Sequence, residues 1–310
     1  MNMRQKSAMT SDRINNARSR LLCATDLTTR SDDAMRRTAL LAEQLEARAI
    51  FIHAVDASQP DELIRMQVNR AHVQLLSDAE RIMNRAQHGF ETEVRLGKPL
   101  QAITVAAREW QPRLTIMAAP QRRTFDALIG TPAERVTRAT NCPVLAVQGS
   151  VDGPYERVVI ATDLGESLES IARTAADVGV FVNTDTWIVH AFEHPYPGVV
   201  AANDSEMVAI AAHTRRLKDG VTLEIARELE QIGVPLDRVR ISALPGQPIE
   251  AIETVTQYVK PDLLVIGVNP SLLLRRLIAG SVVREVFRRA ECDILAIPPV
   301  AARRNWLRAA

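Results

Sequence analysis

Three residues near the end of the chain have the types and spacing that a phosphate-binding loop requires. Gly267 closes a short apolar run, and Gly280 and Ser281 open an amphipathic helix after an intervening loop. A glycine lets an anion approach the backbone, and the free N–H groups at a helix start carry partial positive charge. The pattern therefore predicts a site for a phosphate group. In the alternative interpretation, the glycines serve tight turns and Ser281 caps its helix.

These residues belong to a strand, loop, helix and strand unit that recurs in the first half of the chain. The unit runs from Asp262 to Pro298, and its first copy runs from Leu114 to Val147. Upstream, the segment from Ala24 to Asp56 aligns with the segment from Ala161 to Glu193 at a constant offset of 137 residues. The chain is therefore a tandem repeat.

Each half alternates strand and helix patterns, which predicts five strands and four helices per half. Ser31 is predicted to cap the first helix. Such an order demands a parallel, doubly wound sheet with right-handed crossovers. Ligands of these sheets bind beyond the carboxyl ends of the strands, where Asp26 and Asp163 follow the first strand and Ala118 and Gly267 end the fourth.

The bulk composition indicates two domains without a dominant charge. The chain has 310 residues, with 38 Lys and Arg against 37 Asp and Glu, so no overall field favours nucleic acid or an anionic membrane. No apolar run approaches the roughly 20 residues that span a bilayer, and a cytoplasmic location is predicted. We expect a disordered basic arm at residues 1–18, domains at residues 19–149 and 154–300, and a tail at residues 301–310.

Other residues whose types could support catalysis or metal binding are interpreted as structural. The sequence HAFEH at residues 190–194 fits the H-x-x-E-H pattern of zinc peptidases. That motif needs a helix to place its ligands on one face, whereas His190 ends a strand and Pro195 follows the motif, so no metal site is predicted. The three cysteines lie in or beside buried strand patterns and are interpreted as packing residues: Cys23, Cys142 and Cys292.

On these residues the chain resembles the universal stress protein family in its tandem form. The ATDL start, the strand that ends in His-Ala, the G-x-P-x-x-A-I helix start and the segment around Cys142 and Cys292 occur in both halves. The resemblance implies two flavodoxin-like or Rossmann-like five-stranded parallel sheets that form a pseudo-dimer. It also implies that the last strands of the two halves, Val144 to Val147 and Ile294 to Ile297, pair with each other.

ATP-binding members of that family carry the pattern G-x2-G-x9-G-(S/T). In the second half the matching positions are Gly267, Pro270, Gly280 and Ser281, so a proline without an N–H group replaces the second glycine. In the first half, Ala118 and Gln121 replace both early glycines. The resemblance thus implies an ATP or other adenine nucleotide site in the second half. There, Gly267, Gly280 and Ser281 would hold the phosphates, Asp163 would contact the adenine or order its loop, and Phe192 would lie beside the base.

The function predicted is that of a cytoplasmic stress-response protein, a non-catalytic binding or signalling module with adenine nucleotide as its ligand. The alternative is a nucleotide-free module that binds a protein partner or a small ligand. An ATP-hydrolysing enzyme is the least favoured reading. The two halves are predicted to pair with each other, and the chain could also form a homodimer. Nucleic acid and membranes are not predicted as partners.

Two further features leave their roles open. Arg122-Arg123 and Arg275-Arg276 occupy equivalent loops and could either face phosphate or lie in solvent. The long helical segments Pro60 to Gln87 and Met207 to Ile232 are expected to cover the sheet, with a groove for an apolar ligand or a partner helix as the alternative.

Overall fold

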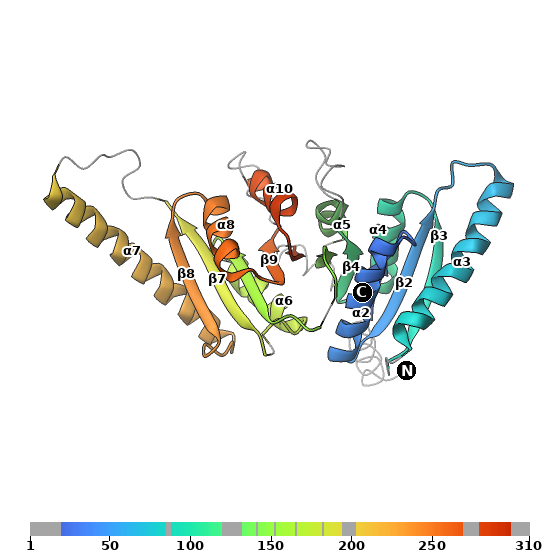
Figure 1. The fold of residues 1–310 in the computed structure, drawn as a ribbon, viewed down its shortest axis with the longest axis horizontal. Helices are drawn as coiled ribbons and strands as arrows, with labels where there is room; N and C mark the ends of the chain where they lie inside the picture. Colours follow the sequence, from blue (N-terminus) through green and yellow to red (C-terminus); the bar gives the residue numbers. More distant parts are fainter. Residues whose placement is uncertain are drawn as a thin grey trace, which may run out of the picture. The chain divides into compact units, whose positions relative to one another are not determined.

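The computed structural model describes residues 20–84, 88–119, 132–140, 142–151, 153–164, 166–181, 183–193, 203–268 and 279–298. These residues form two compact units (Figure 1). Unit 1 comprises the chain up to Pro154 together with the segment from Glu291 onward, and unit 2 comprises Tyr155–Ala290. The expected basic arm, the C-terminal tail and both arginine pairs lie outside the described residues.

Unit 1 contains a sheet with the strand order β3-β2-β1-β4-β5-β10, in which neighbouring strands are parallel except for the pair β5 and β10. Helices α2 and α3 contact each other over this sheet, and α4 and α5 form a second contacting pair. The elements are β1 (Arg20–Ala24), α2 (Thr29–Gln44), β2 (Arg48–Val55), α3 (Asp61–Met83), β3 (Phe90–Leu96), α4 (Pro99–Trp110), β4 (Leu114–Ala118), α5 (Pro132–Thr140), β5 (Val144–Val147) and β10 (Asp293–Ile297).

Unit 2 contains four parallel strands in the order β9-β6-β7-β8. Helix α6 contacts α7, and α10 contacts α8. The elements are β6 (Arg157–Thr162), α6 (Glu166–Asp177), β7 (Asp185–Phe192), α7 (Asp204–Gln231), β8 (Val239–Pro245), α8 (Pro248–Val259), β9 (Leu263–Gly267) and α10 (Ala279–Arg289). In chain order, each half therefore supplies five strands and four helices among the described residues, which confirms the predicted α/β class.

Local sequence explains where these elements begin and end. Strands β1 and β5, which have neighbours on both sides, are short runs of mainly apolar residues that are largely buried, as strands inside a parallel sheet require. Pro99 and Pro248 stand at the first turns of α4 and α8, where a missing N–H group costs nothing. The same two helices end at Gln111 and Lys260, which adopt left-handed conformations with φ of 46° and 48°.

The predicted pairing of the two last strands is confirmed. Strand β10 lies antiparallel to β5, with Leu295 opposite Leu145, Ile294 opposite Ala146 and Ala296 opposite Val144. All residues of both strands are buried. The last strand of the second repeat thus completes the sheet of unit 1 and covers the edge that β5 would otherwise expose.

The three cysteines are free and do not form disulfides, in agreement with their interpretation as packing residues. Cys23 and Cys142 are fully buried, and Cys292 is half-buried. Burial raises the pKa of the Cys23 thiol to about 12, an effect that a hydrogen bond with Thr38 only partly opposes. A thiol with such a pKa is a poor nucleophile at neutral pH.

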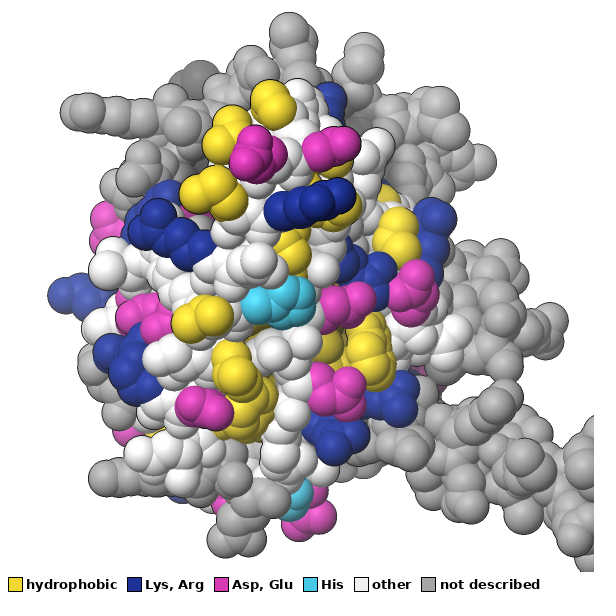
Figure 2. Space-filling view, turned by 90° about the vertical axis from the view of Figure 1, so that its right-hand side faces the viewer, with side chains coloured by type: hydrophobic (Ala, Val, Ile, Leu, Met, Phe, Trp, Pro, Cys, Tyr) yellow, Lys and Arg dark blue, Asp and Glu magenta, His cyan; other side chains and the backbone are white. Residues whose placement is uncertain are grey.

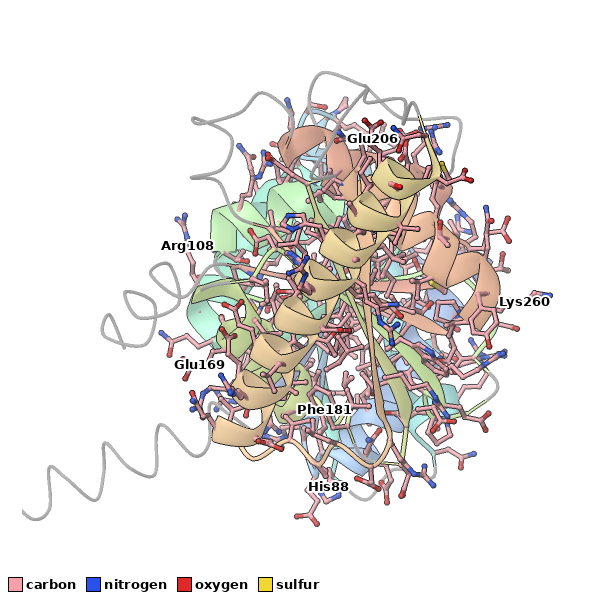
Figure 3. The ribbon with its side chains drawn as sticks, turned by 90° about the vertical axis from the view of Figure 1, so that its left-hand side faces the viewer. His88, Arg108, Glu169, Phe181, Glu206 and Lys260 are labelled. Atoms are coloured by element: carbon pink, nitrogen blue, oxygen red, sulfur yellow. The ribbon has the colours of Figure 1, made fainter. Side chains whose placement is uncertain are left out.

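The two long helices cover the sheet less completely than their periodicity predicts. The buried residues of α3 all lie from Ala71 onward, and those of α7 are Ile225 and Leu229, near its end. On α3, Met66 is 65% exposed and Val73 is 73% exposed, and apolar side chains alternate with charged ones on this face (Figure 2). The N-terminal part of α7, near Glu206, carries no buried residue (Figure 3).

The reason for this difference is length. A helix rises about 1.5 Å per residue, so the 28 residues of α7 extend well beyond the seven residues of β8 on which it packs. Sequence periodicity gives the apolar face of a helix but not the extent of the sheet beneath it. Among the described helices, none combines the length and the hydropathy that a bilayer span requires.

Candidate functional site at the carboxyl ends of the strands

The loops that leave β1 and β6 have the same construction. In each loop a leucine takes a left-handed conformation, with φ of 59° at Leu27 and 62° at Leu164. Their backbone N–H groups donate to Thr25 Oγ1 at 3.0 Å and to Thr162 Oγ1 at 3.2 Å, respectively. A branched residue rarely adopts this conformation, and strained backbone of this kind concentrates at binding sites.

A histidine from the neighbouring strand holds each loop through a hydrogen bond to the backbone of its threonine. His53 Nδ1 lies 2.9 Å from the carbonyl oxygen of Thr25, and His190 Nδ1 lies 2.9 Å from that of Thr162. Because a carbonyl only accepts, Nδ1–H is the donor in both contacts. His190 therefore uses Nδ1 to hold the loop after β6, a role that a zinc site would not require. His194, the other histidine of the zinc-peptidase pattern, lies outside the described residues. The described residues contain no group of side chains that could hold a metal ion.

In unit 1 the aspartate of this loop is held by its neighbours. Asp26 Oδ1 accepts hydrogen bonds from Ser31 Oγ and Thr28 Oγ1, both at 2.6 Å. Partial burial alone would raise the pKa of Asp26, but these hydrogen bonds and the nearby Arg30 lower it below its ordinary value. Ser31 lies inside α2, which begins at Thr29, so the prediction that Ser31 caps the helix was wrong. Its hydroxyl positions Asp26 instead.

In unit 2 the corresponding aspartate has different surroundings. Asp163 follows β6 and is exposed, and the position equivalent to Ser31 is occupied by Leu168. Leu168 is fully buried in the core and has no hydroxyl to donate. The two loops therefore share a backbone conformation, but the serine that bonds Asp26 in the first loop has no counterpart at position 168 of the second.

Strand order brings Asp163 and Gly267 to one edge of the sheet. Strands β6 and β9 are adjacent and parallel, with Ala161 opposite Ile266, so their carboxyl ends lie side by side. The chain runs from β6 to β7 and β8 on one side and then returns to β9 on the other. The point between β6 and β9 is therefore the topological switch point at which doubly wound sheets bind their ligands.

Phe192 ends β7 on the other side of β6, as the sequence predicts. It is half-buried, stands opposite Pro245 in the sheet register, and its carbonyl accepts the N–H of Gly246 at 2.9 Å. Because β7 is adjacent to β6, Phe192 is placed at the same edge as Asp163. Three of the five predicted site residues, Asp163, Phe192 and Gly267, thus converge on the carboxyl edge of unit 2.

Gly267 also has a packing role. A Cβ built at this position would lie 3.0 Å from Ile171 Cδ1 on α6, a distance that real side chains rarely show. The glycine therefore lets α6 pack closely against the end of β9. This role does not compete with ligand binding, because the absence of a Cβ serves both.

Gly280 and Ser281 lie in the first turn of α10, which confirms that they open a helix. The helix is held at its other end, where Val286 and Phe287 are buried and Arg289 pairs with Glu253 of α8. Hydrogen bonds from Arg288 and Arg289 lower the pKa of Glu285 to about 2, with burial as the opposing influence. Pro270 lies outside the described residues, as do Gln121 and Thr131 of the first repeat.

Sequence reasoning missed the residues that shape the loops. Ile171 and Leu168 were not identified as parts of the site, and neither were the hydrogen bonds by which His53 and His190 hold the two loops. A signal was present for the histidines, because His53 and His190 recur at the same offset of 137 residues as the loops that they support. Leu168 and Ile171 look like ordinary core residues of a helix in the sequence.

Comparison with known proteins identifies the repeat. The sequence model of the Universal stress protein family matches residues 17–148 and, separately, residues 154–298. A curated universal stress protein of Methanocaldococcus jannaschii is 23% identical over 144 residues, which cover 46% of this chain and 82% of that protein.

Two solved structures resemble nearly the whole chain. A universal stress protein from Archaeoglobus fulgidus has a TM-score of 0.64 and 16% identity, with 91% of this chain and 97% of that chain covered. A functionally unknown protein from Pseudomonas aeruginosa has a TM-score of 0.60 and 14% identity, with 95% and 98% covered. At such identities the likeness shows the fold. Because the family's sequence model matches most of the chain in two copies, the chain belongs to the universal stress protein family, in tandem form.

Proposed function

We propose that this chain is a cytoplasmic stress-response protein that binds one adenine nucleotide in its second repeat and acts through binding rather than catalysis. The site would consist of Asp163, Phe192, Gly267, Gly280 and Ser281. The first repeat, at residues 19–149, would serve as a scaffold, and the second, at residues 154–300, would carry the ligand.

The observation that carries this proposal is the position of Asp163 and Gly267 on either side of the switch point between β6 and β9. A purine with its ribose needs hydrogen-bond acceptors and an apolar wall, and phosphate needs approachable N–H groups. Asp163 supplies the acceptor, Phe192 the apolar wall, and the first turn of α10 the N–H groups. The left-handed Leu164 next to Asp163 supports a functional role for this loop.

The difference between the two repeats supports a single site. Ala118 stands at the end of β4 in place of Gly267. A nucleotide is therefore expected to prefer unit 2.

Titration of the purified protein with labelled ATP tests the proposal. Saturable binding is expected in the wild type, and Gly280→Val is expected to weaken it at least about tenfold, because a branched side chain would crowd the phosphates at the helix start. Gly149→Val is the matched control, since an added Cβ there meets no atom within 4 Å. Absence of saturable binding in the wild type would refute the nucleotide proposal.

A second candidate function is that of a nucleotide-free interaction module. It is favoured by Pro270, which removes one expected phosphate donor, and by the exposed apolar side chains of α3, including Met66 and Val73. Native mass spectrometry of gently purified protein separates the two candidates. A co-purified adenine nucleotide supports the first, and a protein that neither carries nor binds nucleotide supports the second.

A further inference from the structure

A buried ion pair joins the second repeat's last strand to the first repeat's helix α2 within unit 1. Arg37 Nε lies 3.4 Å from Asp293 Oδ2, and both side chains are only 6% exposed. The contact acts through charge, since it lacks the geometry of a hydrogen bond. Arg37 also donates from Nη1 to the carbonyl of Gly153 in the linker between the repeats, at 2.6 Å. Asp293 Oδ1 accepts the N–H of Gln148 at 2.8 Å, just beyond the end of β5.

This pair breaks the symmetry of the tandem repeat. The position equivalent to Arg37 in the second repeat is Thr174, which is buried and donates its hydroxyl to the carbonyl of Ser170. The position equivalent to Asp293 in the first repeat is Pro143, which carries no charge. The buried arginine therefore occurs only in the first repeat and the buried aspartate only in the second. The two residues meet only when β5 pairs with β10.

Pairing between like repeats would separate these charges. If β5 paired with β5 of another copy, Arg37 would meet a proline, and its guanidinium would be buried without a carboxylate. If β10 paired with another β10, Asp293 would meet a threonine and lose its cation. A buried charge without its partner is strongly destabilising, even though a buried pair adds little net stability over apolar residues. Such a pair is therefore suited to selecting a partner.

We propose that the Arg37–Asp293 pair is a selectivity element that directs β10 onto the β5 edge of a first repeat and excludes pairing of like repeats. The edge of β5 accepts a strand whose first residue is acidic, and β10 supplies that residue in Asp293. The linker carbonyl of Gly153 and the amide of Gln148 complete the surroundings of the two charges. The pair acts in assembly and is independent of any ligand.

Exchange of the two charges between chains tests the proposal. Arg37→Asp places two acids at the site, and Asp293→Arg places two bases there. Each variant alone is expected to lose about a hundredfold or more in its folding equilibrium constant, measured by urea titration. Unfolded together and refolded by dilution, the two variants are expected to exchange β10 reciprocally, since each exchanged strand then meets an opposite charge. The product is a one-to-one heterodimer of twice the 34.3 kDa chain mass, detected by native mass spectrometry.

The control is Arg36→Asp, which alters the exposed neighbouring arginine on α2. Its mixture with Asp293→Arg should give no heterodimer. Absence of the heterodimer from the Arg37→Asp and Asp293→Arg mixture overturns the proposal, whether or not the single variants fold.

Replacement of both charged residues by apolar ones gives a second, independent test of the proposed selectivity. The double variant Arg37→Met with Asp293→Leu should fold, because apolar residues can replace a buried pair. Without the charges it should form like-repeat dimers and larger species when refolded at high protein concentration, at several times the wild-type fraction. A double variant that stays as monomeric as the wild type at every concentration would contradict the proposed selectivity.

Discussion

At the residue scale, the site depends on bonds that hold two strained loops. Each Thr-Asp-Leu loop combines a left-handed leucine, a threonine hydroxyl that accepts the leucine N–H, and a histidine that donates to the threonine carbonyl. Because this arrangement occurs in both units, it does not by itself distinguish the proposed site in unit 2. The ligand preference would then come from residues that differ, such as Ala118 and Gly267.

Replacement of His190 by phenylalanine should destabilise the protein. The change keeps the ring but removes the Nδ1–H bond to the buried Thr162 carbonyl, so the free energy of unfolding should fall by about 1–3 kcal/mol. Urea titration measures this change, and His53→Phe provides the matched variant in unit 1. Addition of a chelator should leave the wild-type unfolding midpoint unchanged. A midpoint that falls on chelation would show instead that His190 binds a metal.

Glu228 on α7 is a residue whose charge opposes folding. Burial is the largest cause of its raised pKa, and the carboxylates of Glu224 and Glu169 raise the pKa further. Glu169 lies on α6, beside the lower part of α7 (Figure 3). A raised pKa in the folded state favours the protonated form. The stability linked to this proton is present below the unfolded-state pKa of about 4.3 and is lost as the pH rises through the folded-state pKa.

Glu228→Gln should therefore raise the melting temperature at pH 7, with the difference vanishing below about pH 4, where the wild-type carboxyl is protonated in both states. Glu230→Gln, an exposed change on the same helix turn, is the control and should have little effect. Thermal unfolding at several pH values checks this expectation. An equal shift for both variants, or a shift that persists at low pH, would contradict it.

At the element scale, the sequence predicts the strands and helices well because each has a local cause. Apolar runs bounded by glycine or proline become buried strands, and Pro99 and Pro248 start helices whose first turns need no N–H group. Ser31 shows the limit of this reasoning, because a serine near a helix start can cap the helix or, as here, bond a side chain five residues earlier. Only the packed loop decides between the two.

Gly267 tests the packing of α6 on β9. Gly267→Ala should destabilise unit 2 by about 1–3 kcal/mol, because its Cβ would lie 3.0 Å from Ile171 Cδ1. Ile171→Val removes that methyl group and should recover much of the loss in the double variant. Urea titration of the single and double variants measures the coupling. Purely additive effects would show that Ile171 does not constrain this position.

The contacts that hold α10 to α8 should govern how mobile the first turn of α10 is, the turn that is proposed to bind phosphate. Glu285→Gln weakens the bonds to Arg288 and Arg289, and Arg289 in turn pairs with Glu253. Amide hydrogen exchange across α10 should become faster, while the melting temperature changes little, because these ion pairs are partly exposed to solvent. Glu250→Gln, an exposed change on α8, is the control. Unchanged exchange in α10 would show that its buried Val286 and Phe287 suffice to hold it.

At the scale of the whole molecule, the repeat could be predicted from the sequence because the internal alignment is nearly complete, and the pairing of the last strands was implied by the resemblance to the universal stress protein family. The asymmetric burial of Arg37 and Asp293 could not be predicted, since two charges 256 residues apart carry no local pattern. The same holds for the candidate site. Asp163, Phe192 and Gly267 were found through a motif, whereas their convergence depends on the strand order β9-β6-β7.

The number of nucleotides bound per chain tests the central claim most directly. Isothermal titration with ATP of the wild type, Asp163→Asn and the matched Asp26→Asn measures both stoichiometry and affinity. We predict one site per chain, weakened about tenfold or more by Asp163→Asn and unchanged by Asp26→Asn, because the first repeat has Ala118 where the second has Gly267. Two sites per chain, no site, or equal loss in both variants would contradict the assignment of the ligand to the second repeat.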